Sequence, residues 1–165
     1  MNELIHKLAI EAQRIEEDTE HSFKSHYNAA ARWAHYHLWI GLPSALLAAG
    51  AAAFKEQPEV AGALAILSTA LTTVLTFLKP SERSEIHKTV AGQYQALRNQ
   101  TRIFREIELT DCVAADEAKT RLLTLAKTRD EINQGAPAIS RCDYELAKKD
   151  IDSGNTRYRI DEAKL

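Results

Sequence analysis

The chain has 165 residues, enough for one domain with a buried core. Its formal net charge is −2 at pH 7, which excludes the broad basic field of a typical nucleic-acid-binding protein. Its two cysteines, Cys112 and Cys142, lack the spacing of a zinc site or a disulfide-rich scaffold, and we interpret them as reduced cytosolic thiols.

Residues 1–35 are predicted to form an amphipathic cytoplasmic helix. Apolar and small residues recur there at alternating spacings of three and four, at Ile5, Leu8, Ala12, Ile15, Thr19 and Ser22. This spacing is typical of a helix whose seam resembles a coiled coil. The pattern predicts a helix that begins near Asn2 and runs, with or without a break, towards the first apolar segment.

Two uncharged segments follow in a chain that is otherwise highly charged. No charged residue occurs in the 17 positions of Leu38–Phe54 or in the 19 positions of Val60–Leu78. A helix rises about 1.5 Å per residue, so the longer segment spans roughly 28 Å, close to the ~30 Å hydrocarbon core of a bilayer. The sequence therefore predicts a transmembrane hairpin over residues 36–79, with spans 36–54 and 60–78 and the short linker Lys55–Glu59.

The residues that flank these segments predict the orientation of the hairpin. Trp33, Tyr36 and Trp39 cluster at one edge, where amphipathic rings prefer the membrane interface. The linker has one basic residue, Lys55, whereas the outer flanks have six: Lys24, Arg32, Lys79, Arg83, Lys88 and Arg98. This excess predicts that both termini are cytoplasmic and that the linker lies on the outer side of the membrane.

Two other interpretations of the apolar segments were open. Eight of the 17 residues in Leu38–Phe54 are Ala or Gly, so both segments suit buried helices of a soluble bundle. The alanines of Ala48–Ala53 also resemble a signal-peptide cleavage site, although the apolar run begins only at residue 38. The membrane hairpin accounts best for the length of both segments.

Residues 80–165 are predicted to form a C-terminal cytoplasmic helical region. A helix over Ser81–Leu109 is expected, with Pro80 before it, Ser81 as its N-cap and a seam that packs on the N-terminal helix at Ile86, Val90, Tyr94, Leu97, Thr101 and Phe104. A shorter helix over Asp116–Asn133 should end before Gly135 and Pro137. A last helix should begin at a capping box, Ser140–Asp143, and stop at Gly154. The predicted class is all-α.

The second apolar segment has a face of hydroxyl groups. On a helical wheel, one arc contains Ser68, Thr69, Thr72, Thr73 and Thr76, and the opposite, lipid-type side contains Leu64, Leu67, Leu71, Val74 and Leu75. The first segment has a weaker small-residue counterpart at Gly41, Ala45, Ala48 and Ala52. The hydroxyl face suits a close-packing seam, or the lining of a water-filled path in an oligomer of several hairpins.

Three further features have a functional and a structural interpretation. Pro43 removes one helical hydrogen bond, so it is a candidate hinge or a static kink. Arg98, Arg102 and Arg105 share a helix face that suits a partner, an anionic headgroup or a nucleotide signal, or else is a solvated face with pairs such as Arg102–Glu106. No metal spacing, cofactor motif or activated nucleophile was found, so we expect neither an enzyme nor a cofactor.

The residues around the two spans resemble the SLATT domain, a bacterial two-transmembrane effector family. The resemblance covers roughly Phe23–Leu109, and its features are Tyr27, Trp33, Gly41-Leu42-Pro43, Phe77-Leu78, Pro80-Ser81-Glu82-Arg83, His87, Tyr94 and Leu97. It implies a homo-oligomeric effector of a conflict or anti-phage system that forms pores in the inner membrane or disrupts it. It also implies a separate sensor or nucleotide-synthase partner and no catalytic residues.

The sequence thus predicts an oligomeric inner-membrane effector that permeabilises the bilayer on a signal. Two alternatives stay open at this point. One is a non-conducting membrane scaffold that recruits a cytosolic partner, and the other is a soluble helical-bundle interaction protein.

Overall fold

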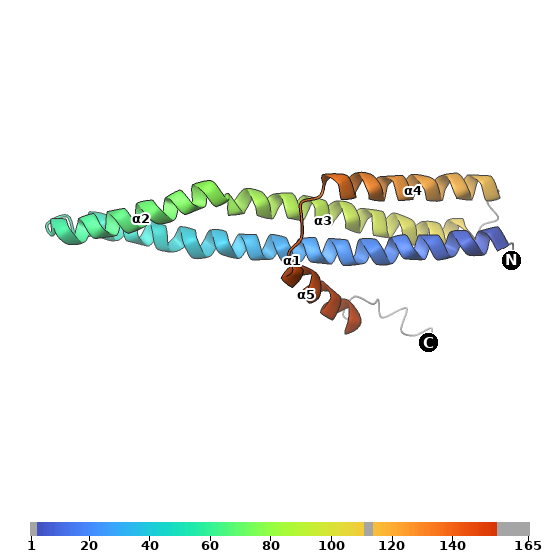
Figure 1. Ribbon diagram of the computed structural model, residues 1–165, viewed down its shortest axis with the longest axis horizontal. Helices are drawn as coiled ribbons and strands as arrows, with labels where there is room; N and C mark the ends of the chain where they lie inside the picture. The colour runs from blue at the N-terminus through green and yellow to red at the C-terminus, as the bar shows by residue number, and fades with distance from the viewer. Residues whose placement is uncertain (1–2, 111–113, 155–165) are drawn as a thin grey trace. The chain divides into compact units, whose positions relative to one another are not determined.

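The computed structural model describes residues 3–110 and 114–154 (Figure 1). Every regular element in these two ranges is helical, which confirms the predicted all-α class. The elements are α1 (Glu3–Ala53), α2 (Pro58–Leu78), α3 (Pro80–Ile103), the π-helical turn η1 (Phe104–Glu108), α4 (Ala115–Gly135) and α5 (Arg141–Asp152). Cys112 lies outside the described residues, and Cys142 is an exposed free thiol.

The chain divides into two compact units. The first unit takes in residues 1–29 and 87–165, and the second unit is Ala30–Ile86. The helical residues 30–35 and 80–86, which flank the apolar segments, are therefore part of the same unit as those segments. Within the second unit, the Ser84 hydroxyl donates to the Ala30 carbonyl at 2.8 Å, and this buried bond joins the two flanks.

The core of the first unit lies along one seam that α1, α3 and α4 share. Its buried residues are Leu8, Ala12, Ile15, Leu97, Phe104, Ala118, Leu122 and Leu125. The spacings of three and four in each helix turn these side chains to one side, which is the pattern expected of an amphipathic helix. Two ion pairs border the core, Arg105–Glu16 at 2.7 Å and Arg98–Glu20 at 3.3 Å.

The junction between α2 and α3 differs from the sequence-based expectation. Lys79 adopts a left-handed conformation, with φ 46° and ψ 52°, and its N–H donates to the Leu75 carbonyl at 2.9 Å. The expected N-cap at Ser81 is wrong, because Pro80 is already the first helical residue. The fixed φ of proline suits that position, and its missing N–H would have had no helical partner there.

The helix expected to continue to Leu109 changes its hydrogen bonding near its end. α3 stops at Ile103, and the Leu109 N–H donates to the carbonyl of Phe104, five residues earlier, at 3.0 Å. A π-helical turn of this kind widens the helix locally. Phe104, the first residue of that turn, is buried in the core.

The last helix begins and ends as the sequence predicts. The Ser140 hydroxyl accepts from the Asp143 N–H at 3.2 Å and donates to the Asp143 carboxylate at 2.6 Å. This side-chain cap confirms the expected N-terminus of α5. The helix stops at Asp152, and Gly154 has the positive φ of 76° that closes the turn after it.

Phe104 provides a direct test of the core. We expect Phe104→Ala to lower the local unfolding free energy of the first unit by about 3–5 kcal/mol, because it leaves a cavity between three helices. Hydrogen exchange of the α4 amides in the intact chain measures this change. The neighbouring residue Ile103 is 46% exposed, so Ile103→Ala is the matched control and should change that free energy by only about 0.5 kcal/mol. Equal effects of the two substitutions would contradict the assigned core.

Candidate functional site

A pair of serines joins the two helices of the second unit at mid-length. The Ser68 hydroxyl donates to the Ser44 carbonyl at 2.9 Å, and the Ser44 hydroxyl lies 3.1 Å from the Ser68 carbonyl and 2.8 Å from the Thr72 hydroxyl. Both serines are buried. Hydroxyl contacts of this kind fix the register of two apolar helices, because an unpaired polar group between them would be costly.

Close approach of α1 to α2 depends on glycine on one side and leucine on the other. A β-carbon on Gly50 would lie 3.3 Å from Leu64 Cδ1, and one on Gly41 would lie 3.6 Å from Leu75 Cδ1. The seam therefore runs through Gly41, Ser44 and Gly50 of α1. Of the predicted small-residue face, Gly41 is on this seam, whereas the structure leaves Ala45, Ala48 and Ala52 exposed.

The leucines of α2 are also arranged differently from the wheel-based expectation. Leu64 and Leu75 were placed on the lipid-type side, but they pack against the glycines of α1 and are partly buried. A leucine fills the groove above a glycine, so the α2 side of the seam combines the small Ser68 with the bulky Leu64 and Leu75. The expectation that all these leucines face away from α1 is wrong for these two.

The five predicted hydroxyls separate into two sets. Ser68 is buried against Ser44 of α1, and Thr72, although exposed, also contacts Ser44. The other three are exposed and bond within α2: Thr69, Thr73 and Thr76. Each of these three donates to the carbonyl four residues earlier, at 2.8, 2.8 and 2.9 Å respectively. The hydroxyl hydrogens are thus satisfied within α2, while oxygen lone pairs remain for water or another copy.

Most of the apolar surface of the second unit is uncovered. Both helices are long and apolar enough to cross a membrane, and only 6% of the most apolar 18-residue window of each is buried. Large side chains are among the most exposed, with Trp39 at 74%, Ile66 at 71% and Phe77 at 79%. Pro43, the candidate hinge, lies inside α1 and is partly buried, one residue before the Ser44 contact.

Two of the three arginines of the predicted patch pair with carboxylates of α1. Arg98 and Arg105 form the ion pairs with Glu20 and Glu16, and Arg105 also lies 2.8 Å from Glu106. Arg102 is partly buried and engaged in an interaction of its own. At least two of the three charges are thus used between helices, because α1 covers the face that the sequence pattern leaves open.

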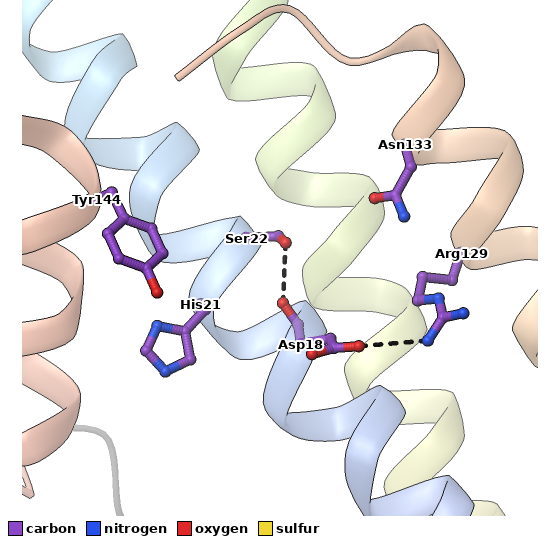
Figure 2. A pocket seen from close by; sticks show the side chains of 6 residues that line it. All are labelled: Asp18, His21, Ser22, Arg129, Asn133 and Tyr144. Carbon is purple, nitrogen blue, oxygen red and sulfur yellow. Dashed lines mark hydrogen bonds and ion pairs between the residues drawn. The ribbon is translucent and has the colours of Figure 1, made fainter. Parts of the chain in front are cut away.

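The first unit has a polar cavity of about 510 Å³ (Figure 2). It is lined by Asp18, His21 and Ser22 of α1, Arg129 and Asn133 of α4, and Tyr144 of α5. The rings of His21 and Tyr144 stack at 5.9 Å, and Arg129 pairs with Asp18 at 3.3 Å. A neighbouring carboxylate, Asp130, lies 3.1 Å from Arg129 as well, so the arginine charge is compensated and the cavity is a weak anion site.

Sequence reasoning did not find this cavity, because its lining comes from three separated helices with no shared motif. Ser44, by contrast, had a signal. It is the only hydroxyl residue in Leu38–Phe54, and a lone hydroxyl in an apolar helix indicates a polar partner in the facing helix. Across the described ranges, no group of His, Cys, Asp and Glu side chains is arranged to hold a metal ion.

Two buried histidines meet between α1 and α3 in the first unit. The Nδ1 atoms of His26 and His87 are 2.9 Å apart, and the Tyr94 ring stacks on His26 at 5.6 Å. A single hydrogen bond of this kind requires one nitrogen to donate and the other to accept, so at least one ring is neutral. Burial, followed by the charge of His87, lowers the pKa of His26 from 6.5 to about 4.

No protein-family model, curated protein or solved structure matches the chain. The resemblance to the SLATT family therefore stays a prediction from sequence motifs.

The histidine pair predicts acid destabilisation of the first unit. His26 binds a proton more weakly when folded, so its contribution to stability is complete above pH 6.5 and is lost as the pH falls towards 4. The loss is at most about 3 kcal/mol. Hydrogen exchange of α3 amides between pH 7.5 and 5, corrected for the intrinsic exchange rate, measures it.

Variants separate this effect from general acid destabilisation. His26→Gln should flatten the pH dependence, and His87→Gln should make it shallower by removing the like charge. His6 is exposed and lies in the same unit, so His6→Gln is the matched control and should leave the slope unchanged. A full slope in His26→Gln would contradict the assignment.

Proposed function

We propose that this chain is an oligomeric effector of the bacterial inner membrane that permeabilises the bilayer when a separate partner or signal activates it. The proposal depends on one observation above all: two membrane-length apolar helices that the chain itself leaves uncovered. Contiguous apolar surface of this size is typical of contact with lipid or with other subunits.

Burial distinguishes the proposal from the soluble-bundle alternative. Alanine-rich core helices of a soluble protein would be covered by their own fold, whereas these helices expose Trp39, Ile66 and Phe77. In a bilayer the same side chains lie in hydrocarbon, and the backbone groups along both spans pair within their own helices, except where Pro43 removes one helical hydrogen bond. The exposure of these large apolar side chains favours insertion of both helices into a bilayer.

The need for several copies follows from the number of helices. Two packed helices enclose no water, so a conducting path requires several hairpins. The outward row of Thr69, Thr73 and Thr76 is the polar face that such an assembly would turn inwards. Uncharged hydroxyls would line a wide pore of low ion selectivity.

The identity of the activating partner comes from the SLATT resemblance alone. That resemblance favours a sensor protein or a nucleotide synthase as the source of the signal, in a conflict or anti-phage system. The first unit, on the cytoplasmic side in the predicted orientation, would receive it. No catalytic step is proposed for this chain.

Reconstitution tests the permeabilising function. The purified protein is placed in liposomes over a range of protein-to-lipid ratios, and insertion is confirmed by resistance to alkaline extraction. Dye and ion release should rise steeply with protein density, since assembly is required. Extraction at alkaline pH would contradict membrane insertion. Insertion without release at any density would favour the non-conducting scaffold instead.

The threonine row has its own test. A triple substitution of Thr69, Thr73 and Thr76 by leucine should reduce release at least about tenfold while insertion and oligomer size are kept, because a polar lining becomes apolar. Ile66→Leu, on an equally exposed position of α2, is the matched control and should release dye like the unmodified chain. Unchanged release by the triple variant would exclude the threonine lining.

A further inference from the structure

Two arginines from different helices converge on one tryptophan in the second unit. The guanidinium carbon of Arg83, on α3, lies 4.8 Å from the centre of the Trp33 ring, and that of Arg32, on α1, lies 5.2 Å from it. Tyr36 completes the cluster: its ring meets Trp33 edge-on at 5.6 Å and lies 5.7 Å from Arg32. We name these four residues the Trp33 cluster.

The cluster is held by the backbone of the α2–α3 junction. The left-handed turn at Lys79 and the buried Pro80 start α3 beside α1. Ser84, the residue after Arg83, donates its hydroxyl hydrogen to the Ala30 carbonyl at 2.8 Å, and both residues are buried. Arg83 is therefore positioned next to Trp33 before any ligand binds.

The cluster lies at the charged ends of the two apolar segments. Arg32 is the last charged residue before Leu38–Phe54. Lys79 follows directly after Val60–Leu78, and Glu82 and Arg83 come within the next four positions. If the hairpin spans the bilayer, as the proposed function requires, this position is at the depth of the lipid headgroups. Tryptophan and tyrosine rings favour that depth, and basic residues there attract anionic lipids.

We propose that the Trp33 cluster binds the phosphate of an anionic phospholipid headgroup. A guanidinium group that stacks on a ring uses one of its faces and keeps its N–H edge available for hydrogen bonds. That edge matches phosphate oxygens, and Arg83 presents such an edge beside the Trp33 ring. Tyr36, which is 43% exposed, offers a hydroxyl at the same site.

One acidic neighbour of the cluster, Glu82, is paired with a lysine outside it. Lys79 pairs with Glu82 at 3.0 Å, and both side chains remain more than half exposed. Arg32 has an additional interaction within the chain, so the proposal gives Arg83 the leading role. An exposed surface pair is worth little in water, and a lipid phosphate therefore competes with it readily.

A titration in detergent tests the site without any need for permeabilisation. The chain has two tryptophans, so Trp39→Phe makes Trp33 the only one and its fluorescence reports on the cluster. The intact protein in a neutral detergent is titrated with short-chain phosphatidylglycerol, with phosphatidylcholine and with inorganic phosphate. We expect a saturable change with phosphatidylglycerol at a mole fraction at least about tenfold lower than with phosphatidylcholine.

Substitutions show whether Arg83 recognises the lipid by geometry or by charge alone. Arg83→Gln should weaken phosphatidylglycerol binding about tenfold, and Arg83→Lys should weaken it less, because lysine keeps the charge but loses the planar fork. The matched control is Lys55→Gln, which removes one charge from the linker of the same unit and should leave the midpoint unchanged. Helix content by circular dichroism checks that each variant is folded.

Several outcomes would overturn the proposal. Equal effects of Arg83→Gln and Lys55→Gln would mean attraction by net charge and no site at Trp33. Equal midpoints for the three titrants would exclude headgroup recognition, and tighter binding of inorganic phosphate would identify a free anion as the ligand. Failure of the proposed function gives a different pattern, because a chain that binds phosphatidylglycerol through Arg83 but never releases dye keeps this site.

Discussion

Two packed helices bury only one narrow face of each other. In the second unit, no third helix packs along the apolar segments of α1 and α2. The seam of Gly41, Ser44 and Gly50 against α2 uses that face, and within residues 3–110 and 114–154 most of the remaining apolar side chains of both helices are left exposed. This constraint explains the unequal chemistry of the protein. The first unit buries its own core, whereas the second leaves most of its apolar side chains exposed.

Polar groups in the second unit are placed where an apolar environment can tolerate them. Ser44 and Ser68 satisfy each other's carbonyls, and the exposed threonines donate back to their own helix. Charge and amphipathic rings are confined to the ends, where Arg83 and Arg32 meet Trp33. An assembly of hairpins could therefore exchange lipid for water along the threonine row without exposing an unsatisfied hydroxyl hydrogen.

Several ionisable side chains of the first unit lie between its helices. Glu16 and Glu20 of α1 pair with arginines of α3 and η1, and the two histidines share a buried hydrogen bond in which at least one ring is neutral. These contacts couple the α1–α3 packing to charge. A change in the charge of these side chains, by pH or by a bound partner, would thus alter the contacts of α1. This helix also forms one side of the seam in the second unit.

The sequence by itself determined the helices, their periodic faces and the length of the apolar segments, because these depend on local spacing and composition. It identified the serine cap of α5 and the core residues Leu8, Ala12, Ile15, Leu97 and Phe104 for the same reason. The same pattern was wrong for Ile86, which is exposed. It could not assign partners to the faces. Several contacts join residues far apart in the chain: the leucines that pack on glycine, the ion pairs of Arg98 and Arg105 with α1, the lining of the polar cavity, and Arg83 on Trp33. Only the tertiary structure decided them, since a helix rotated by a fraction of a turn keeps the same pattern but meets a different neighbour.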